Sequence, residues 1–324
     1  MPKGVKRKRK CSVKKKKKKR KRPKVEEKVR STQGGHDFGV VAIDLGEHDS
    51  SINIPFEFED YLPRPPIRAL MVAPSGSGKT TLIGNLLNEN QTNGRNNFYK
   101  DYFGDRMTII SSTLLLDDIW KTFPDEILKQ AYFEFSPQVL TAKWLECKKD
   151  CAKNGKSAEN ARLFVLDDLA QEIYRGGQKS VVGDMFMSVR HCNGSVLVTT
   201  QKYKKMPGTL RTNATVIFIF EIANMAELKS IHDEHGGQLE WKQWLYMLRE
   251  MVWNTPHAFL TIDLKQDPDN RFRKNFEPPL SIKEIKRRAA GGKDYTDESA
   301  EMSSDSDSDA DSLNGDDENV LMLE

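Results

Sequence analysis

Short apolar runs alternate with amphipathic helical patterns through the middle of this chain. A strand that is buried on both faces is apolar at nearly every position, and parallel strands need helical crossovers to connect them. The pattern therefore predicts an α/β fold, in which a mostly parallel central sheet is covered by helices on both faces. The predicted strands are Ala69–Val72, Met107–Ile110, Leu163–Leu166, Ser195–Thr199, Val216–Phe220 and Phe259–Ile262.

Helical spacing of apolar residues marks three segments between these runs: 117–156, 181–191 and 239–252. In the last of them Trp241 and Trp244 repeat at helical spacing, which predicts that they belong to the core rather than to a base-stacking platform. Before the first strand, residues 54–59 alternate in polarity and include a proline, a pattern that suits an edge strand.

A Gly-rich segment, Ala73–Thr80, joins the first predicted strand directly to a helical pattern. Strand, Gly-rich loop and helix in this order are typical of a P-loop, whose backbone N–H groups surround phosphate oxygens at a helix N-terminus. We expect Lys79 to contact the β- and γ-phosphates of ATP and the hydroxyl of Thr80 to ligate Mg²⁺. The alternative is a turn that binds nothing. The residues expected to surround the nucleotide are Ala73, Pro74, Ser75, Gly76, Ser77, Gly78, Lys79, Thr80 and Thr81.

The first position of this motif is Ala73, where the usual residue is glycine. Alanine disfavours a left-handed backbone, so we expect the loop to begin with ordinary strand-like angles.

Two acids, Asp167 and Asp168, directly follow the predicted strand Leu163–Leu166. In P-loop enzymes an acid at the end of a neighbouring strand holds Mg²⁺, and we assign this role to Asp167. The next acid can polarise the attacking water, so Asp168 is the candidate catalytic base, shorter than the more usual glutamate. The alternative is a carboxylate that caps the following helix.

Two further polar residues are candidates for the catalytic step. Gln201 follows the strand Ser195–Thr199, where it can sense the γ-phosphate, or else faces solvent. Arg211 lies in the loop before the next strand and can reach a neighbouring subunit's γ-phosphate, or else is solvated. Between them, residues 202–205 combine lysines with Tyr203, which suits either a DNA-contacting loop or a solvated one.

Charge is distributed very unevenly along the 324 residues. Residues 1–30 contain 18 Lys and Arg against two Glu, and residues 294–324 contain 12 Asp and Glu without Lys or Arg. Segments so charged and so poor in apolar residues cannot bury enough surface to fold. We therefore expect a disordered basic tail at 1–35, a P-loop domain at 36–290 and a disordered acidic tail at 291–324. The basic tail is predicted to bind a nuclear import receptor, to contact DNA, or both.

Four cysteines are too sparse for a disulfide scaffold, and no apolar run approaches the length of a membrane span. Cys147, Cys151 and Cys192 match no common zinc pattern, so we expect free thiols. Together with the basic tail, these features predict a reducing compartment, the nucleus of a eukaryotic cell, and no membrane partner.

The motifs in this order resemble the DNA-packaging ATPases of large eukaryotic DNA viruses, the poxvirus-type branch of the FtsK–HerA P-loop superfamily. The resemblance spans about residues 54–276 and extends to virophages and virus-like DNA transposons. It rests on the segments Gly76–Thr80, Phe164–Asp168, Val198–Gln201, Pro207–Asn213 and Phe259–Asp263. It implies a homo-oligomeric ring that hydrolyses ATP, pumps double-stranded DNA into a capsid, and contacts a capsid or portal-region protein. The expected location is then the host cell nucleus, with the virion as an additional one.

Two other functions are compatible with the P-loop alone. One is a nucleotide or small-molecule kinase, although no insertion rich in arginine that would form a lid is evident. The other is a nuclear DNA-binding protein with a purely structural nucleotide site. A GTP-binding switch is disfavoured, because Gln201–Lys204 lacks the guanine-specifying Asn-Lys-x-Asp and Asp167–Ala170 lacks the Asp-x-x-Gly of that class.

Overall fold

The computed structural model describes residues 61–87, 98–169, 173 and 180–291. Within them, one sheet has the strand order β3-β2-β4-β5-β1-β6-β7-β8. The strands are β1 (Arg68–Val72), β2 (Met107–Ser111), β3 (Ala131–Tyr132), β4 (Arg162–Asp167), β5 (Gly194–Thr200), β6 (Val216–Phe220), β7 (Phe259–Asp263) and β8 (Phe272–Lys274).

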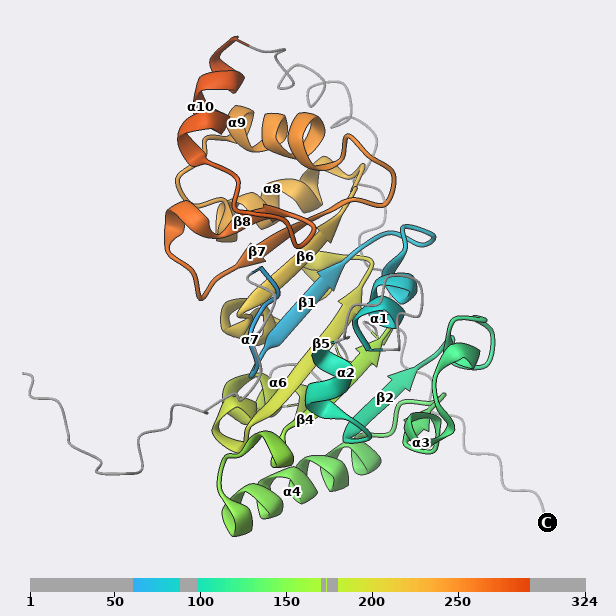
Figure 1. Ribbon diagram of the computed structural model, residues 1–324. Helices are drawn as coiled ribbons and strands as arrows, with labels where there is room; N and C mark the ends of the chain where they lie inside the picture. The colour runs from blue at the N-terminus through green and yellow to red at the C-terminus, as the bar shows by residue number, and fades with distance from the viewer. Residues whose placement is uncertain (1–60, 88–97, 170–172, 174–179, 292–324) are drawn as a thin grey trace, which may run out of the picture. The chain divides into compact units, whose positions relative to one another are not determined.

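The six strands from β3 to β6 pair in parallel, whereas β7 at the other end of the sheet pairs antiparallel with both β6 and β8. Figure 1 shows the arrowheads of β1, β2 and β5 pointing to the same edge. Parallel strands bring their carboxyl ends together, so the loops that follow β1, β2, β4, β5 and β6 gather at that edge. The predicted mostly parallel sheet is confirmed.

Helices cover both faces of this sheet. The α-helices are α1 (Lys79–Leu87), α2 (Phe98–Phe103), α3 (Asp125–Leu128), α4 (Pro137–Asn154), α6 (Val181–Ser188), α7 (Gly208–Asn213), α8 (Met225–His235), α9 (Trp241–Tyr246) and α10 (Ile282–Gly291). Short 3₁₀ segments are η2 (Trp120–Thr122), η3 (Ala158–Asn160), η4 (Val189–Cys192), η5 (Tyr203–Lys205) and η7 (Pro268–Asn270), and η6 (Met247–Val252) is a π-helix that continues α9.

Alternation along each strand divides the core into two layers. In β1, Leu70 and Val72 face the layer that packs against α4 and α6 to α10, whereas Ala69 and Met71 face the layer that packs against α1, α2 and α3. All four side chains are fully buried. Burial on both faces explains why the parallel strands are continuously apolar in the sequence.

The predicted helical segment 117–156 is only partly correct. Its second half forms α4, with Ser136 accepting a hydrogen bond from the Val139 N–H as N-cap. Its first half is instead η2, the single turn α3 and the two-residue strand β3. Proline at 124 ends the helical path there, and β3 exists only through its pairing with β2.

The other helical predictions fit the structure. Residues 181–191 form α6 and most of η4, and 239–252 contain α9 and η6. Trp244 is buried in the core and Trp241 packs partly buried against it. The predicted edge strand at 54–59 and both charged tails lie outside the described residues, apart from Gly291, which ends α10. None of the helices described is both long enough and apolar enough to cross a bilayer.

Candidate nucleotide site

The P-loop connects β1 to α1 at the carboxyl edge of the sheet. Ala73 extends β1 by donating its N–H to the Thr200 carbonyl at 2.9 Å, and its backbone is not left-handed, as predicted from its side chain. The left-handed positions are Gly76 (φ 75°) and Gly78 (φ 103°), which a residue with a Cβ adopts only with strain. The chain therefore makes its sharp turn at the two glycines that the motif supplies.

A cavity of about 490 Å³ opens over this loop and the first turns of α1. It brings Lys79 and Thr80 together with Asp167 and Asp168, which the sequence separates by almost ninety residues. Among the predicted phosphate-binding residues, Ser75, Gly76, Gly78, Lys79, Thr80 and Thr81 line the cavity, whereas Ala73, Pro74 and Ser77 form its supporting backbone.

Asp167 ends β4 and is almost completely buried. Its two carboxylate oxygens accept hydrogen bonds from the hydroxyls of Thr199 and Ser111, each at 2.8 Å. Burial raises the pKa of Asp167, while these two hydroxyls and the charge of Lys79 act in the opposite direction. The hydroxyl groups of Ser111 in β2 and Thr199 in β5 thus hold the carboxylate in one orientation.

Asp168 follows in a left-handed conformation (φ 55°), and its N–H donates to Thr199 Oγ1 at 2.8 Å. A positive φ at a non-glycine residue is uncommon and is concentrated at functional sites. The Gln201 amide donates to both Asp168 oxygens, at 3.2 and 3.4 Å. The structure therefore brings these two candidates together, although Gln201 itself does not line the cavity.

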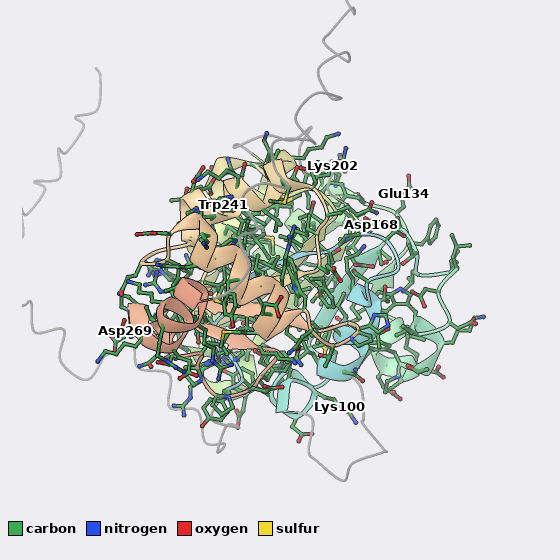
Figure 2. The ribbon with its side chains drawn as sticks, turned by 90° about the horizontal axis from the view of Figure 1, so that it is seen from above. Lys100, Glu134, Asp168, Lys202, Trp241 and Asp269 are labelled. Carbon is green, nitrogen blue, oxygen red and sulfur yellow. The ribbon has the colours of Figure 1, made fainter. Side chains whose placement is uncertain are left out.

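Figure 2 helps to locate this acid within the sheet. Seen from above, Glu134 and Asp168 lie toward one side of the molecule and Trp241 and Asp269 toward the other. This is the order in which the sheet arranges β3 and β4 at one end and β7 and β8 at the other.

Arg211 lies outside the cavity lining, on α7. Its guanidinium forms an ion pair with Glu234, donates to the Met206 carbonyl and lies over the ring of Tyr203. In this subunit Arg211 thus has no contact with the nucleotide site, and its role toward a neighbouring subunit stays a prediction.

The predicted DNA-contacting segment 202–205 requires a correction. Tyr203 is fully buried, and its hydroxyl bonds to Glu234 and to His235 Nε2, both at 2.7 Å. Burial lowers the pKa of His235 to about 4, and because the Tyr203 hydroxyl donates its proton to Glu234, the neutral imidazole donates from Nε2 to the tyrosine oxygen. Only the lysines of this segment are exposed, and the aromatic ring has no surface to offer a base.

Sequence reasoning missed several residues of the cavity wall. Thr113 lies after β2, bonds to Ser111 Oγ at 3.0 Å and accepts from Trp120 Nε1 at 3.3 Å. Since Ser111 uses its proton on Asp167, Thr113 must donate to Ser111, and a chain of hydrogen bonds runs from Trp120 to the carboxylate. Asp167 is predicted from its place at the carboxyl end of a strand. By the same reasoning Ser111, which ends β2, and Thr113, just after it, could have been predicted.

Phe220, His257 and Phe259 complete the wall on the other side of the P-loop. Phe220 ends β6, so its position at the carboxyl end of a parallel strand could also have predicted it. His257 and Phe259 come from the loop before the antiparallel strand β7 and from its first residue, and no local motif in the sequence marks them.

The donor set at the β4 side of the cavity fits a magnesium ion. The Thr80 hydroxyl and the Asp167 carboxylate line the same cavity, and oxygen ligands of this kind are the ones that Mg²⁺ prefers. The predicted ligand pair is therefore chemically suitable.

The cysteines within the described residues, Cys147, Cys151 and Cys192, are free thiols. Burial raises the pKa of Cys147 to about 12, which keeps that thiol protonated. Among the residues that the structure describes, no group of three or more His, Cys, Asp or Glu is arranged to hold a metal ion.

Comparison with known structures gave several distant likenesses. The genome packaging NTPase B204 from Sulfolobus turreted icosahedral virus 2, in complex with AMP, is 15% identical with a TM-score of 0.46, over 67% of this chain and 100% of that one. The pCW3 conjugation coupling protein TcpA is 12% identical with a TM-score of 0.40, over 69% of this chain and 64% of that one. A comparison with curated proteins gave no match.

A family model described as the poxvirus A32 protein matches residues 55–238. The match contains the P-loop, the acid pair, Gln201 and Arg211, and ends before His257 and Phe259. Because it covers more than half of the 324 residues, the chain belongs to the poxvirus A32 protein family.

Proposed function

We propose that this protein is an ATP-hydrolysing motor that translocates double-stranded DNA and packages viral genomes into capsids. Membership of the poxvirus A32 protein family supports the packaging role. The observation that carries the catalytic part is one cavity in which Lys79 and Thr80 of the P-loop meet Asp167 and Asp168 of β4.

Each residue has a distinct task in the proposed mechanism. Lys79 binds the β- and γ-phosphates, and the backbone N–H groups of the loop surround them at the N-terminus of α1. Thr80 and Asp167 would hold Mg²⁺, which neutralises charge on the phosphates when it is bound. Asp168 accepts a proton from the attacking water, and Gln201, bonded to Asp168, orients both partners.

The hydrogen bonds around Asp167 support these separate roles. Thr199 donates to Asp167 and accepts from the Asp168 N–H, so one side chain of β5 sets the position of both acids. Gln201 lies two residues further along the same strand end. A shift of β5 relative to β4 would therefore change the hydrogen bonds of the metal-binding acid, the base and Gln201 at the same time.

The proposal includes a homo-oligomeric ring in which Arg211 contributes to the site of a neighbouring subunit. It also includes a host-nuclear location, with the basic segment 1–30 serving as import signal, DNA-binding arm or both, and a capsid or portal-region protein as docking partner. The proposed ring, location and docking partner rest on the charge of the tail and on the family resemblance.

The test is ATP hydrolysis by the full chain with and without long duplex DNA. We expect strong stimulation by DNA, and a loss of at least about a hundredfold in Lys79→Ala, because the charge that holds the γ-phosphate is removed. Lys149→Ala, which changes an exposed lysine of α4, is the matched control for loss of a lysine.

Three results would contradict the proposal. Phosphate transfer to an added nucleoside would indicate a kinase. ATP binding without ATP hydrolysis, whether or not DNA is added, would indicate a structural nucleotide site. No affinity for adenine nucleotides at millimolar magnesium would remove the motor altogether.

A further inference from the structure

The nucleotide cavity has two chemically different ends on either side of the P-loop. Asp167 ends β4 and Asp168 follows it, and β4 lies beyond β5 on one side of β1. Phe220 ends β6 and Phe259 begins β7, on the opposite side of β1. The acid pair belongs beside the γ-phosphate, so a triphosphate held by the P-loop must direct its nucleoside toward the β6–β7 end.

His257 is the polar residue of that second end. Its Nδ1 lies 3.1 Å from the carbonyl oxygen of Ser77, in the middle of the P-loop. A Cβ added at Gly78 would lie 3.6 Å from His257 Nδ1 and 3.7 Å from Phe220 Cε1. The imidazole and the phenyl ring therefore both lie against the backbone of the phosphate-binding loop.

The hydrogen bond to Ser77 determines which ring nitrogen of His257 is left to bind a ligand. A carbonyl oxygen only accepts, so Nδ1 must carry the proton that it donates. In the neutral imidazole Nε2 is then an acceptor, and no hydrogen bond to it is made by the described residues. The side chain is exposed and lines the cavity, which leaves Nε2 accessible to a ligand.

The backbone at this position is unusual as well. His257 has a φ of 60°, in the left-handed region that non-glycine residues rarely adopt. It follows Thr255 and Pro256 in an exposed loop, where a turn bond joins the Ala258 N–H to the Thr255 carbonyl. Strain of this kind persists where surrounding structure imposes it, and here it turns the imidazole onto the P-loop.

We propose that His257 is the nucleoside-recognition residue of this site and selects adenine over guanine. Its Nδ1–H braces Ser77, while its Nε2 accepts a hydrogen bond from the 6-amino group of adenine. Guanine carries a carbonyl at that position, which would meet the Nε2 lone pair with another acceptor. Phe220 and Phe259, with ring centroids 5.2 Å apart, provide the apolar surface beside it. This inference rests on the proposed function in that ATP is the ligand.

The experiment compares binding of ATP, GTP and inorganic tripolyphosphate to the full chain and to His257→Asn. Asparagine tolerates a positive φ and can still donate to Ser77, but it has no atom in the place of Nε2. We expect His257→Asn to weaken ATP binding about tenfold, to narrow the preference for ATP over GTP, and to leave tripolyphosphate binding within about twofold. Thr255→Ala, in the same exposed loop, is the control and should bind all three as the wild type does.

Two outcomes would overturn the inference while leaving the proposed function intact. Unchanged ATP affinity and base preference in His257→Asn would show that Nε2 reads nothing. Equal weakening of ATP and tripolyphosphate would show that the histidine only braces the P-loop. By contrast, a wild-type protein that binds tripolyphosphate and ATP but hydrolyses neither with DNA would count against the motor, not against base recognition.

Discussion

Asp167 shows how single hydroxyl groups set the chemistry of this site. Its carboxylate is taken almost entirely out of water, which raises its pKa, and Ser111 and Thr199 return part of the lost solvation through hydrogen bonds. Only the ionised form can hold a divalent cation. The two hydroxyls therefore extend the range of acidity over which the site can work.

The hydrogen bond from Ser111 to Asp167 makes the pH dependence of Ser111→Ala predictable. Removing one hydrogen bond to the carboxylate raises the pKa of Asp167 further, so the protonated, inactive form accumulates at a higher pH than in the wild type. The acid limb of the ATPase pH profile should move upward, with activity at its acidic end lower by roughly tenfold. The measurement is kcat against pH at saturating ATP and magnesium.

The control for this prediction is Ser230→Ala, at a partly exposed position of α8 where the hydroxyl donates to the Ala226 carbonyl. Its profile should coincide with that of the wild type. An acid limb that does not move in Ser111→Ala would mean that ionisation of Asp167 does not limit turnover.

At the scale of elements, β5 is the strand on which the site depends most. It pairs with β4 and β1, and its carboxyl end contributes Thr199 and leads to Gln201. Its first residue, Gly194, packs against η4, where an added Cβ would lie 2.5 Å from Val189 Cγ2 and 3.4 Å from the Val189 carbonyl. There is no room for a side chain at the start of this strand.

We therefore expect Gly194→Ala to lower the free energy of unfolding by about 1–3 kcal/mol, because overpacking shifts η4 or β5. Gly208→Ala is the matched control: it begins α7 with no atom within 4 Å of an added Cβ and should change stability by no more than about 1 kcal/mol, in the stabilising direction. Urea unfolding followed by circular dichroism measures both. Equal stabilities of the two variants would contradict the packing argument.

Elements with a strong local pattern were predictable from the sequence. The apolar strands from β1 to β7 other than β3, together with α1 and α4, have patterns that their own residues specify. The P-loop and the acid pair follow from adjacency to such strands. By contrast, β3 has two residues and is defined by its partner β2, so no local pattern marks it.

Tertiary contacts explain the rest of what the sequence left open. His257 reaches Ser77 across 180 residues, through an antiparallel return of the chain that no motif announces. Tyr203 is polar at its tip and lies among lysines, which favours an exposed loop. Its burial depends on Glu234 and His235 of α8, which follow more than thirty residues later.

At the scale of the whole molecule, Arg211 decides whether one subunit contains a complete site. In this chain its guanidinium is engaged by Glu234 and Tyr203 and lies outside the cavity lining. A finger that acts on a neighbour must come from such a position, since an arginine of the same subunit that reached the phosphates would line the cavity. The ring proposal therefore predicts that the P-loop and Arg211 of one active site belong to different chains.

Mixing two inactive variants tests this directly. Arg211→Ala retains its P-loop, and Lys79→Ala retains its arginine, so an interface that takes its P-loop from the first variant and its arginine from the second contains a complete site. Because only one ordered pair in four is complete in a random one-to-one mixture, activity should recover to at most about a quarter of the wild-type rate. DNA-stimulated ATPase of the mixture is the measurement, and Arg287→Ala, on the exposed face of α10, should be fully active alone. If mixed oligomers form and recover no activity, Arg211 does not act between subunits.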